Sequence, residues 1–79
     1  SGCTVLDLSR VGMGCPDILV GRAGHNFLFE IKDGNKPPSS RKLTIPEQAF
    51  FAMWRGNVQE VKSLNEAIES INETLKHKG

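Results

Sequence analysis

The alternation of apolar and polar residues predicts β-strands in the first third of the chain. Residues 4–9, TVLDLS, alternate around Val5, Leu6 and Leu8, as a strand with one buried face does. The segments DILVG and NFLFEIK then flank residues 22–25, RAGH. We expect these four residues to form the loop of a β-hairpin, because two apolar runs meet across a short stretch that contains glycine.

Counting outward from this loop gives the register of the hairpin. It pairs Val20 with Phe27 and Asp17 with Glu30. Since side chains alternate between the faces of a sheet, one face becomes entirely apolar, and a slip of one residue would destroy it. The apolar face holds Ile18, Val20, Phe27, Phe29 and Ile31. The opposite face holds Asp17, Leu19, Leu28, Glu30 and Lys32.

The same register brings two carboxylates together, which is unfavourable for stability alone. Like charges directly opposite each other on a sheet repel, and charged groups are costly to bury without a partner. Asp17 and Glu30 therefore need a nearby cation, which is either Lys32 on the same face or a bound metal ion. An ordinary salt bridge at the end of the sheet remains the alternative interpretation.

The second half of the chain predicts a loop, a helix, a short strand and a second helix. Residues 33–42, DGNKPPSSRK, form the loop, in which two prolines exclude regular structure. Thr44 and Glu47 form a capping box that begins a helix, and Gly56 is placed to end it. Its apolar stripe consists of Ala49, Phe50, Met53 and Trp54. We expect Phe50, Phe51 and Trp54 to lie in the core.

Residues 58–63, VQEVKS, predict a short edge strand. Ser63 and Glu66 form a second capping box before the last helix, whose period of 3.6 gives it one apolar face. That face consists of Leu64, Ala67, Ile68, Ile71 and Leu75. The order of elements is βββαβα, so we expect an α/β fold in which both helices pack on a small mixed sheet.

Length and composition limit what such a chain can do. The 79 residues fit a single domain, residues 1–79, with a core so small that a homodimer is expected. The net charge of +1 gives no general argument for binding nucleic acid. Cys3 and Cys15 have no framework or metal-ligand spacing, so we expect free thiols in a reducing compartment. No apolar run approaches the length of a membrane span or a signal peptide.

The charged residues also carry a resemblance. Pro16-Asp17, followed after twelve residues by Glu30-Ile31-Lys32, has the spacing of the PD-(D/E)XK nucleases. Four blocks in order, GMGCPDILVG, FEIKDG, KLTIPEQAFFAMWRG and VQEVKS, resemble the virus-type replication–repair (VRR-NUC) branch of that superfamily. The resemblance covers about residues 5–67 and implies a restriction-endonuclease-like core.

The resemblance implies a site and a function. Asp17, Glu30 and the backbone carbonyl of Ile31 would bind Mg²⁺ or Mn²⁺, Lys32 would act beside the scissile phosphate, and Gln48 would orient Lys32 or the substrate, with Glu47 as the alternative. The chain would then be a metal-dependent DNA endonuclease, a phosphodiesterase that acts on branched or four-way junction DNA. It would act in the cytoplasm of a bacterium or a phage-infected host. A non-cleaving nucleic-acid-binding module and a small protein-interaction domain are the alternative functions.

Two further features bear on this expectation. Relatives usually begin with a helix that carries a glutamate, whereas this chain starts at the first strand. That helix is removed, dispensable, or replaced by a partner subunit, for example in a homodimer with exchanged elements, and Asp7 is a weaker candidate for the missing acid.

The central loop offers basic side chains and hydroxyls that suit contacts with DNA phosphates, although a solvated loop is the alternative. These residues are Lys36, Ser39, Ser40, Arg41 and Lys42.

Overall fold

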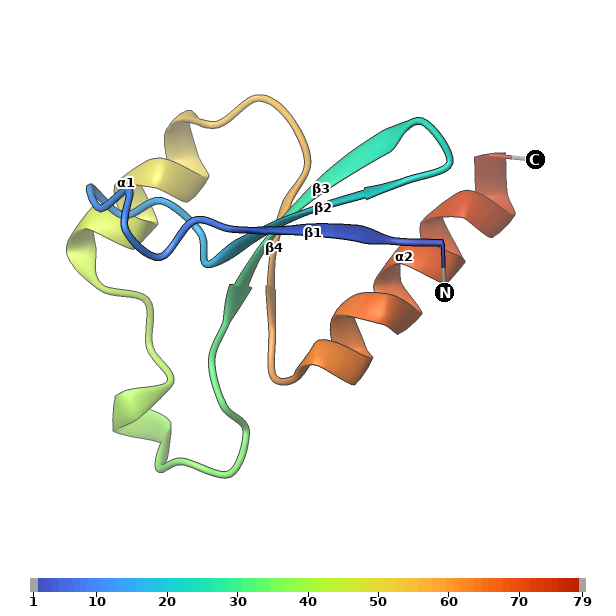
Figure 1. Cartoon of the computed structure of the whole chain (residues 1–79). Coiled ribbons are helices and arrows are strands. Elements are labelled where there is room, and N and C mark those ends of the chain that lie inside the picture. The colour runs from blue at the N-terminus through green and yellow to red at the C-terminus, as the bar shows by residue number, and fades with distance from the viewer. Residues whose placement is uncertain (1, 79) are drawn as a thin grey trace.

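The first three strands and a fourth strand just before the last helix form one mixed, open sheet. The computed structural model describes residues 2–78, and its fold is shown in Figure 1. The strands are β1 (Thr4–Asp7), β2 (Ile18–Arg22), β3 (His25–Ile31) and β4 (Val58–Val61), in the order β1-β2-β3-β4. β1, β2 and β3 are antiparallel, and β4 pairs with β3 in parallel. The helices are a short 3₁₀ turn η1 (Pro38–Ser40), α1 (Ile45–Met53) and α2 (Leu64–Lys78).

The register of the hairpin agrees with the sequence prediction. Val20 pairs with Phe27 and Leu19 with Leu28. β4 lies at an edge of the sheet, as predicted for residues 58–63. The small mixed α/β fold expected from the order of elements is therefore confirmed, but only α2, and not α1, contributes buried residues to the packing on the sheet.

The hairpin loop is shorter than predicted. Arg22 and His25 are paired, so the turn consists of Ala23 and Gly24 alone. Both have positive φ, 51° and 81°, which is the conformation of the two-residue turns that match the twist of a hairpin. The sequence signal was weak because alanine seldom adopts this conformation, and asparagine or glycine usually stands in its place.

Ala23→Asn should therefore stabilise the protein by about 0.5 kcal/mol, because asparagine tolerates positive φ better than alanine. Ala23→Val should have the opposite effect, since a β-branched residue is strained there. Urea unfolding of the two variants measures both changes. An equal change in the free energy of unfolding for both variants would contradict this turn geometry.

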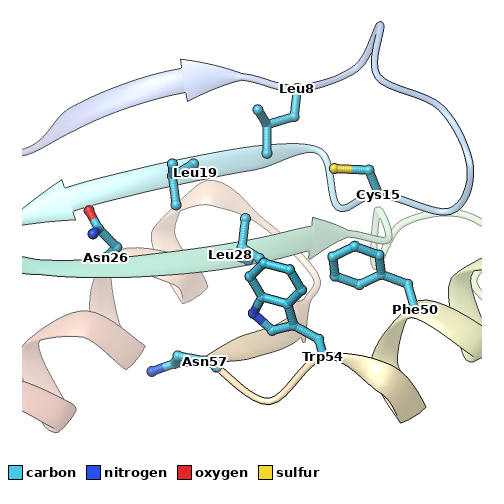
Figure 2. A pocket seen from close by; sticks show the side chains of 9 residues that line it. Leu8, Cys15, Leu19, Asn26, Leu28, Phe50, Trp54 and Asn57 are labelled. Atoms are coloured by element: carbon cyan, nitrogen blue, oxygen red, sulfur yellow. The ribbon is translucent and has the colours of Figure 1, made fainter.

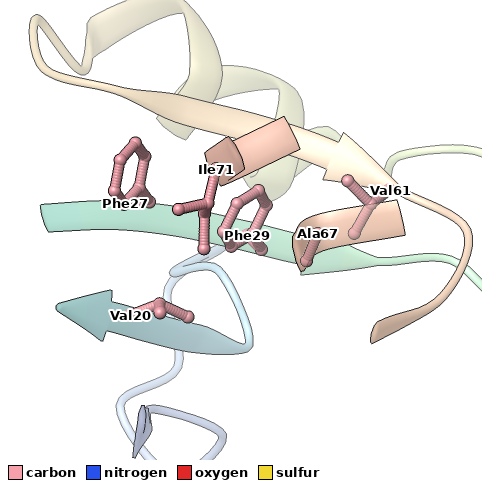
Figure 3. Packing of buried hydrophobic residues seen from close by; sticks show 6 residues of the cluster. All are labelled: Val20, Phe27, Phe29, Val61, Ala67 and Ile71. Carbon is pink, nitrogen blue, oxygen red and sulfur yellow. The ribbon is translucent and has the colours of Figure 1, made fainter. Parts of the chain in front are cut away.

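The core lies between α2 and one face of the sheet. Phe27 and Phe29 are 2% and 0% exposed, and Ala67 and Ile71 of α2 pack against them (Figure 3). Val20 and Val61 complete the buried cluster. This face is the one that the alternating pattern predicted to be apolar. Leu64 and Ile68, which were expected on the packed face of α2, remain 54% and 37% exposed, so the contact covers only part of the predicted stripe.

α1 begins as predicted and ends early. Thr44 and Glu47 form the complete capping box. The helix ends at Met53 rather than near Gly56, because the Asn57 carbonyl already accepts a hydrogen bond from Leu28 N–H of β3. No residue of α1 is buried, and Trp54, beyond its end, is 44% exposed. The prediction that Trp54 lies in the core is therefore wrong, and Phe50 and Phe51 are only half-buried.

The beginning of α2 shows half of the second predicted capping box. Glu66 N–H donates to Ser63 Oγ, whereas the Glu66 carboxylate accepts from Lys62 N–H instead of the Ser63 backbone. Within residues 2–78, neither helix has the length and apolar character needed to cross a bilayer. Cys3 and Cys15 are unpaired and half-buried.

Candidate active site

Asp17 extends the pairing of β2 and β3 beyond the last strand residue. Its N–H donates to the Phe29 carbonyl at 3.0 Å, and its Oδ2 accepts from Ile31 N–H at 2.7 Å. The two bonds go to the residues on either side of Glu30, so Asp17 lies beside Glu30, although the regular pairing of β2 with β3 ends one residue earlier, at Ile18 with Phe29. The N–H and C=O of a strand residue point to the same side. The Ile31 carbonyl, predicted as a metal ligand, therefore points toward the side of Asp17.

Glu30 is the buried acid of this region. Glu30 is 3% exposed, and its Oε1 is buried with no hydrogen-bond partner among the described residues. Burial, and then the neighbouring charges of Asp17 and Glu47, raise the pKa of Glu30 from 4.5 to about 8, although Lys32 opposes the shift. A buried acceptor without a partner costs free energy, so this oxygen is unfavourable for the fold unless a proton or a cation binds it.

Lys32 lies between two carboxylates. Its Nζ is 2.8 Å from Glu47 Oε1 and 3.7 Å from Glu30 Oε2, and all three side chains are largely buried. The hydrogen bond that Lys32 donates to the Glu47 carboxylate raises the pKa of Lys32, although burial opposes this. Burial also disfavours the charged form of Glu47, but the bonds from Lys32 and Thr44 lower its pKa overall. Lys32 is therefore a fixed positive charge at neutral pH and not a proton acceptor.

Glu47 reaches Lys32 because of where α1 begins. Its carboxylate also accepts from Thr44 N–H at 2.8 Å, so the capping box fixes its direction. The position of this first turn depends on Gly14. A Cβ at Gly14 would lie 2.2 Å from the Pro46 carbonyl oxygen, so only glycine allows the loop before β2 to contact α1 this closely.

Gln48, predicted to orient Lys32, is turned elsewhere. It is exposed, and its Nε2 donates to the Leu43 carbonyl at 3.0 Å. Glu47, the alternative for this role, makes the contact with Lys32 instead. The capping box predicted from the sequence also contains Glu47, so this residue makes both contacts. Asp7 was the other candidate for an acid of the metal site. Its carboxylate accepts a hydrogen bond from Ser9 N–H instead of lying with those of Asp17 and Glu30.

The predicted DNA-binding residues lie in the loop that follows Lys32. Lys36, Ser39, Ser40 and Lys42 are exposed, whereas Arg41 is half-buried and its buried Nε has no partner among residues 2–78. The 3₁₀ turn Pro38–Ser40 gives part of the loop a regular shape. Figure 1 shows the loop projecting beyond the sheet on the side of α1. Contact of these residues with DNA stays a prediction.

The donor atoms fit one kind of metal ion. Residues 2–78 hold no group of three or more His, Cys, Asp or Glu side chains arranged around a common metal position, so a closed structural site does not fit. Asp17 and Glu30 supply two carboxylates, and Mg²⁺ typically takes one or two carboxylates and completes its shell with water and phosphate oxygens. The unpartnered Oε1 of Glu30 suits that arrangement.

Comparison of the chain with models of known protein families, with curated proteins and with solved structures finds no match in any of the three.

Proposed function

We propose that this chain is a divalent-metal-dependent DNA endonuclease of the PD-(D/E)XK type, within its VRR-NUC branch. The observation that carries the proposal is the buried carboxylate of Glu30, which has an unpartnered oxygen and lies beside Asp17 on the next strand. Stability alone does not favour two acids side by side on neighbouring strands, because like charges there repel each other.

Each polar residue of the site has a part in this proposal. Asp17, Glu30 and the Ile31 carbonyl would hold Mg²⁺ or Mn²⁺. The ion, when bound, lowers the pKa of a coordinated water and withdraws charge from the phosphate. Lys32 offers a positive charge to the phosphate oxygens, where negative charge develops during hydrolysis. Glu47 keeps the Lys32 ammonium charged and in position. Gln48 contributes to the site only if α1 moves when substrate binds.

The recognition of DNA follows from the same residues. The site contains no element that reads base pairs in the major groove, so contacts to phosphates and to the shape of the DNA are expected to dominate. Lys36, Arg41 and Lys42, with Ser39 and Ser40, are the proposed phosphate contacts, and affinity should fall steeply with salt. Branched DNA as the substrate, the homodimer and its exchanged elements remain predictions.

Incubation with labelled DNA tests the proposal. We expect linear, flap or four-way junction substrates to be cut with Mg²⁺ or Mn²⁺ and to remain intact with a chelator. The alternatives give other results, because a binding module would retard DNA on a gel without nicking it, and a protein-interaction domain would do neither. Intact DNA at every metal concentration would refute the nuclease.

Asp17→Asn should weaken Mn²⁺ binding by at least about tenfold, since the amide removes one of two charged ligands. Isothermal titration calorimetry measures the affinity. Asp7→Asn is the matched control, because it removes an exposed carboxylate on the neighbouring strand and should leave Mn²⁺ affinity unchanged. Equal affinity of the parent and Asp17→Asn would remove Asp17 from the metal site.

A further inference from the structure

An open apolar groove of about 490 Å³ lies on the face of the sheet opposite α2. Figure 2 shows Leu19 and Leu28 of the sheet on one side of it and Phe50 and Trp54 on the other. The volume falls within the range of small-molecule sites, which are mostly apolar with a few polar groups. The groove has no part in the proposed chemistry so far.

The aromatic wall of the groove presents a flat surface. The Phe50 and Trp54 rings are stacked, with centroids 5.1 Å apart and planes at 16°. Trp54 nevertheless remains 44% exposed, although it is the largest apolar side chain of the protein. Its neighbour across the groove is an aliphatic sheet face, so a planar group could enter between them with an apolar surface on both sides.

Polar groups occur at the ends of the groove. The amide side chains of Asn26 and Asn57 line it away from α1, whereas Cys15 lies at the end near Phe50 (Figure 2). Cys15 also connects the groove with the proposed site, because it stands two residues before Asp17. Leu19 and Leu28, which line the groove, are a pair in the sheet and stand two residues along their strands from Asp17 and Glu30, so the groove lies on the same face as the two carboxylates.

We propose that this groove holds an unpaired nucleobase of the DNA strand that is cut. The inference rests on the proposed nuclease function and specifies its substrate, which would carry unpaired nucleotides next to the scissile phosphate. A base has a flat face that stacks on aromatic rings, and edges that accept and donate hydrogen bonds to amides. A lipid chain would leave the amides unused, and a base pair would be too wide for the single aromatic wall.

Fluorescence of Trp54 tests this directly, because it is the only tryptophan and the chain contains no tyrosine. The full chain is titrated in chelator, so that no DNA is cut, with a short oligothymidylate and with an abasic oligomer of equal length. Both probes carry the same phosphates. We expect the thymidylate to quench Trp54 and to bind about 5- to 150-fold more tightly than the abasic oligomer, the effect of one stacked base.

Two variants control for the structure of the protein. Trp54→Leu should lose the preference for the thymidylate, measured by anisotropy of labelled DNA, while its affinity for the abasic oligomer is unchanged. Met53→Leu, at the neighbouring and 69% exposed position, should keep the preference. Far-ultraviolet circular dichroism of both variants shows whether they fold like the parent.

The possible results test the base-binding site independently of the nuclease activity. Equal affinity for both oligomers, with DNA cut in Mg²⁺ or Mn²⁺, would refute the base site and leave the nuclease intact. A preference for the thymidylate without cutting would support the base site and refute the nuclease. Trp54 fluorescence that changes with protein concentration, and not with DNA, would show that a second copy of the chain fills the groove, which also refutes the inference.

Discussion

Glu30→Gln is expected to stabilise the metal-free protein at alkaline pH and to slow DNA cleavage strongly. The parent has a Glu30 pKa of about 8 when folded, against 4.5 for an ordinary glutamate. Because the folded state holds this proton more tightly, its contribution to stability is complete below about pH 4.5 and disappears as the pH rises through 8. The loss is on the order of 5 kcal/mol, which is a large part of the stability of a small domain.

Glutamine has nearly the same shape and no charge to bury, so the variant should not lose this stability. Urea unfolding in chelator, at about pH 5 and about pH 9, measures the difference. We expect the parent to weaken at the higher pH and Glu30→Gln to exceed it there by about 1–3 kcal/mol. Glu69→Gln, an exposed position on α2, is the control and should follow the parent at both values.

Adding Mn²⁺ should make the parent protein more stable than Glu30→Gln, which is the reverse of their order without metal. Mn²⁺ at 100 times its dissociation constant stabilises a protein that binds it by about 2.7 kcal/mol, and Glu30→Gln should gain much less. Cleavage by the variant should fall by about 10²- to 10³-fold, because several kcal/mol of charge stabilisation are lost. A parent equally stable at both pH values would contradict the burial of an unpaired carboxyl. A variant that cuts DNA normally would remove Glu30 from the site.

The part of the fold that the sequence predicts well is the hairpin. Its register follows from a strict alternation, because only one pairing buries Val20, Phe27 and Phe29 on the same side. That pairing also determines that Asp17 meets Glu30, which is why the two carboxylates could be identified without a structure. Local capping signals likewise determine where α1 begins.

The sequence could not decide between Gln48 and Glu47 as the partner of Lys32, because this contact depends on packing between segments far apart in the chain. Lys32 and Glu47 meet because the loop before β2 and the first turn of α1 lie against each other, and no periodicity reports this. The exposure of Trp54 has the same origin. An apolar stripe predicts that a helix face is buried, but it cannot show that a groove separates that face from the sheet, as it does here beside Leu19.

Gly14→Ala tests the contact on which the position of α1 depends, and we expect it to be the most destabilising of the single substitutions considered. A Cβ at residue 14 would lie 2.2 Å from the Pro46 oxygen and 2.4 Å from the Pro46 carbonyl carbon, so the helix or the loop must move. Gly14 also has φ +77°, which strains alanine. Together these effects should cost about 3–5 kcal/mol in urea unfolding.

Gly12→Ala separates the two causes. Gly12 has the same φ of +77°, but a Cβ there would meet no atom within 4 Å. It should therefore show only the backbone cost, about 1–2 kcal/mol. The remaining difference between the variants measures the contact between Gly14 and Pro46. Because moving α1 separates Glu47 from Lys32, Gly14→Ala should also cut DNA more slowly than Gly12→Ala under conditions where both are folded. Equal stability and equal cleavage of the two variants would mean that this loop does not position α1.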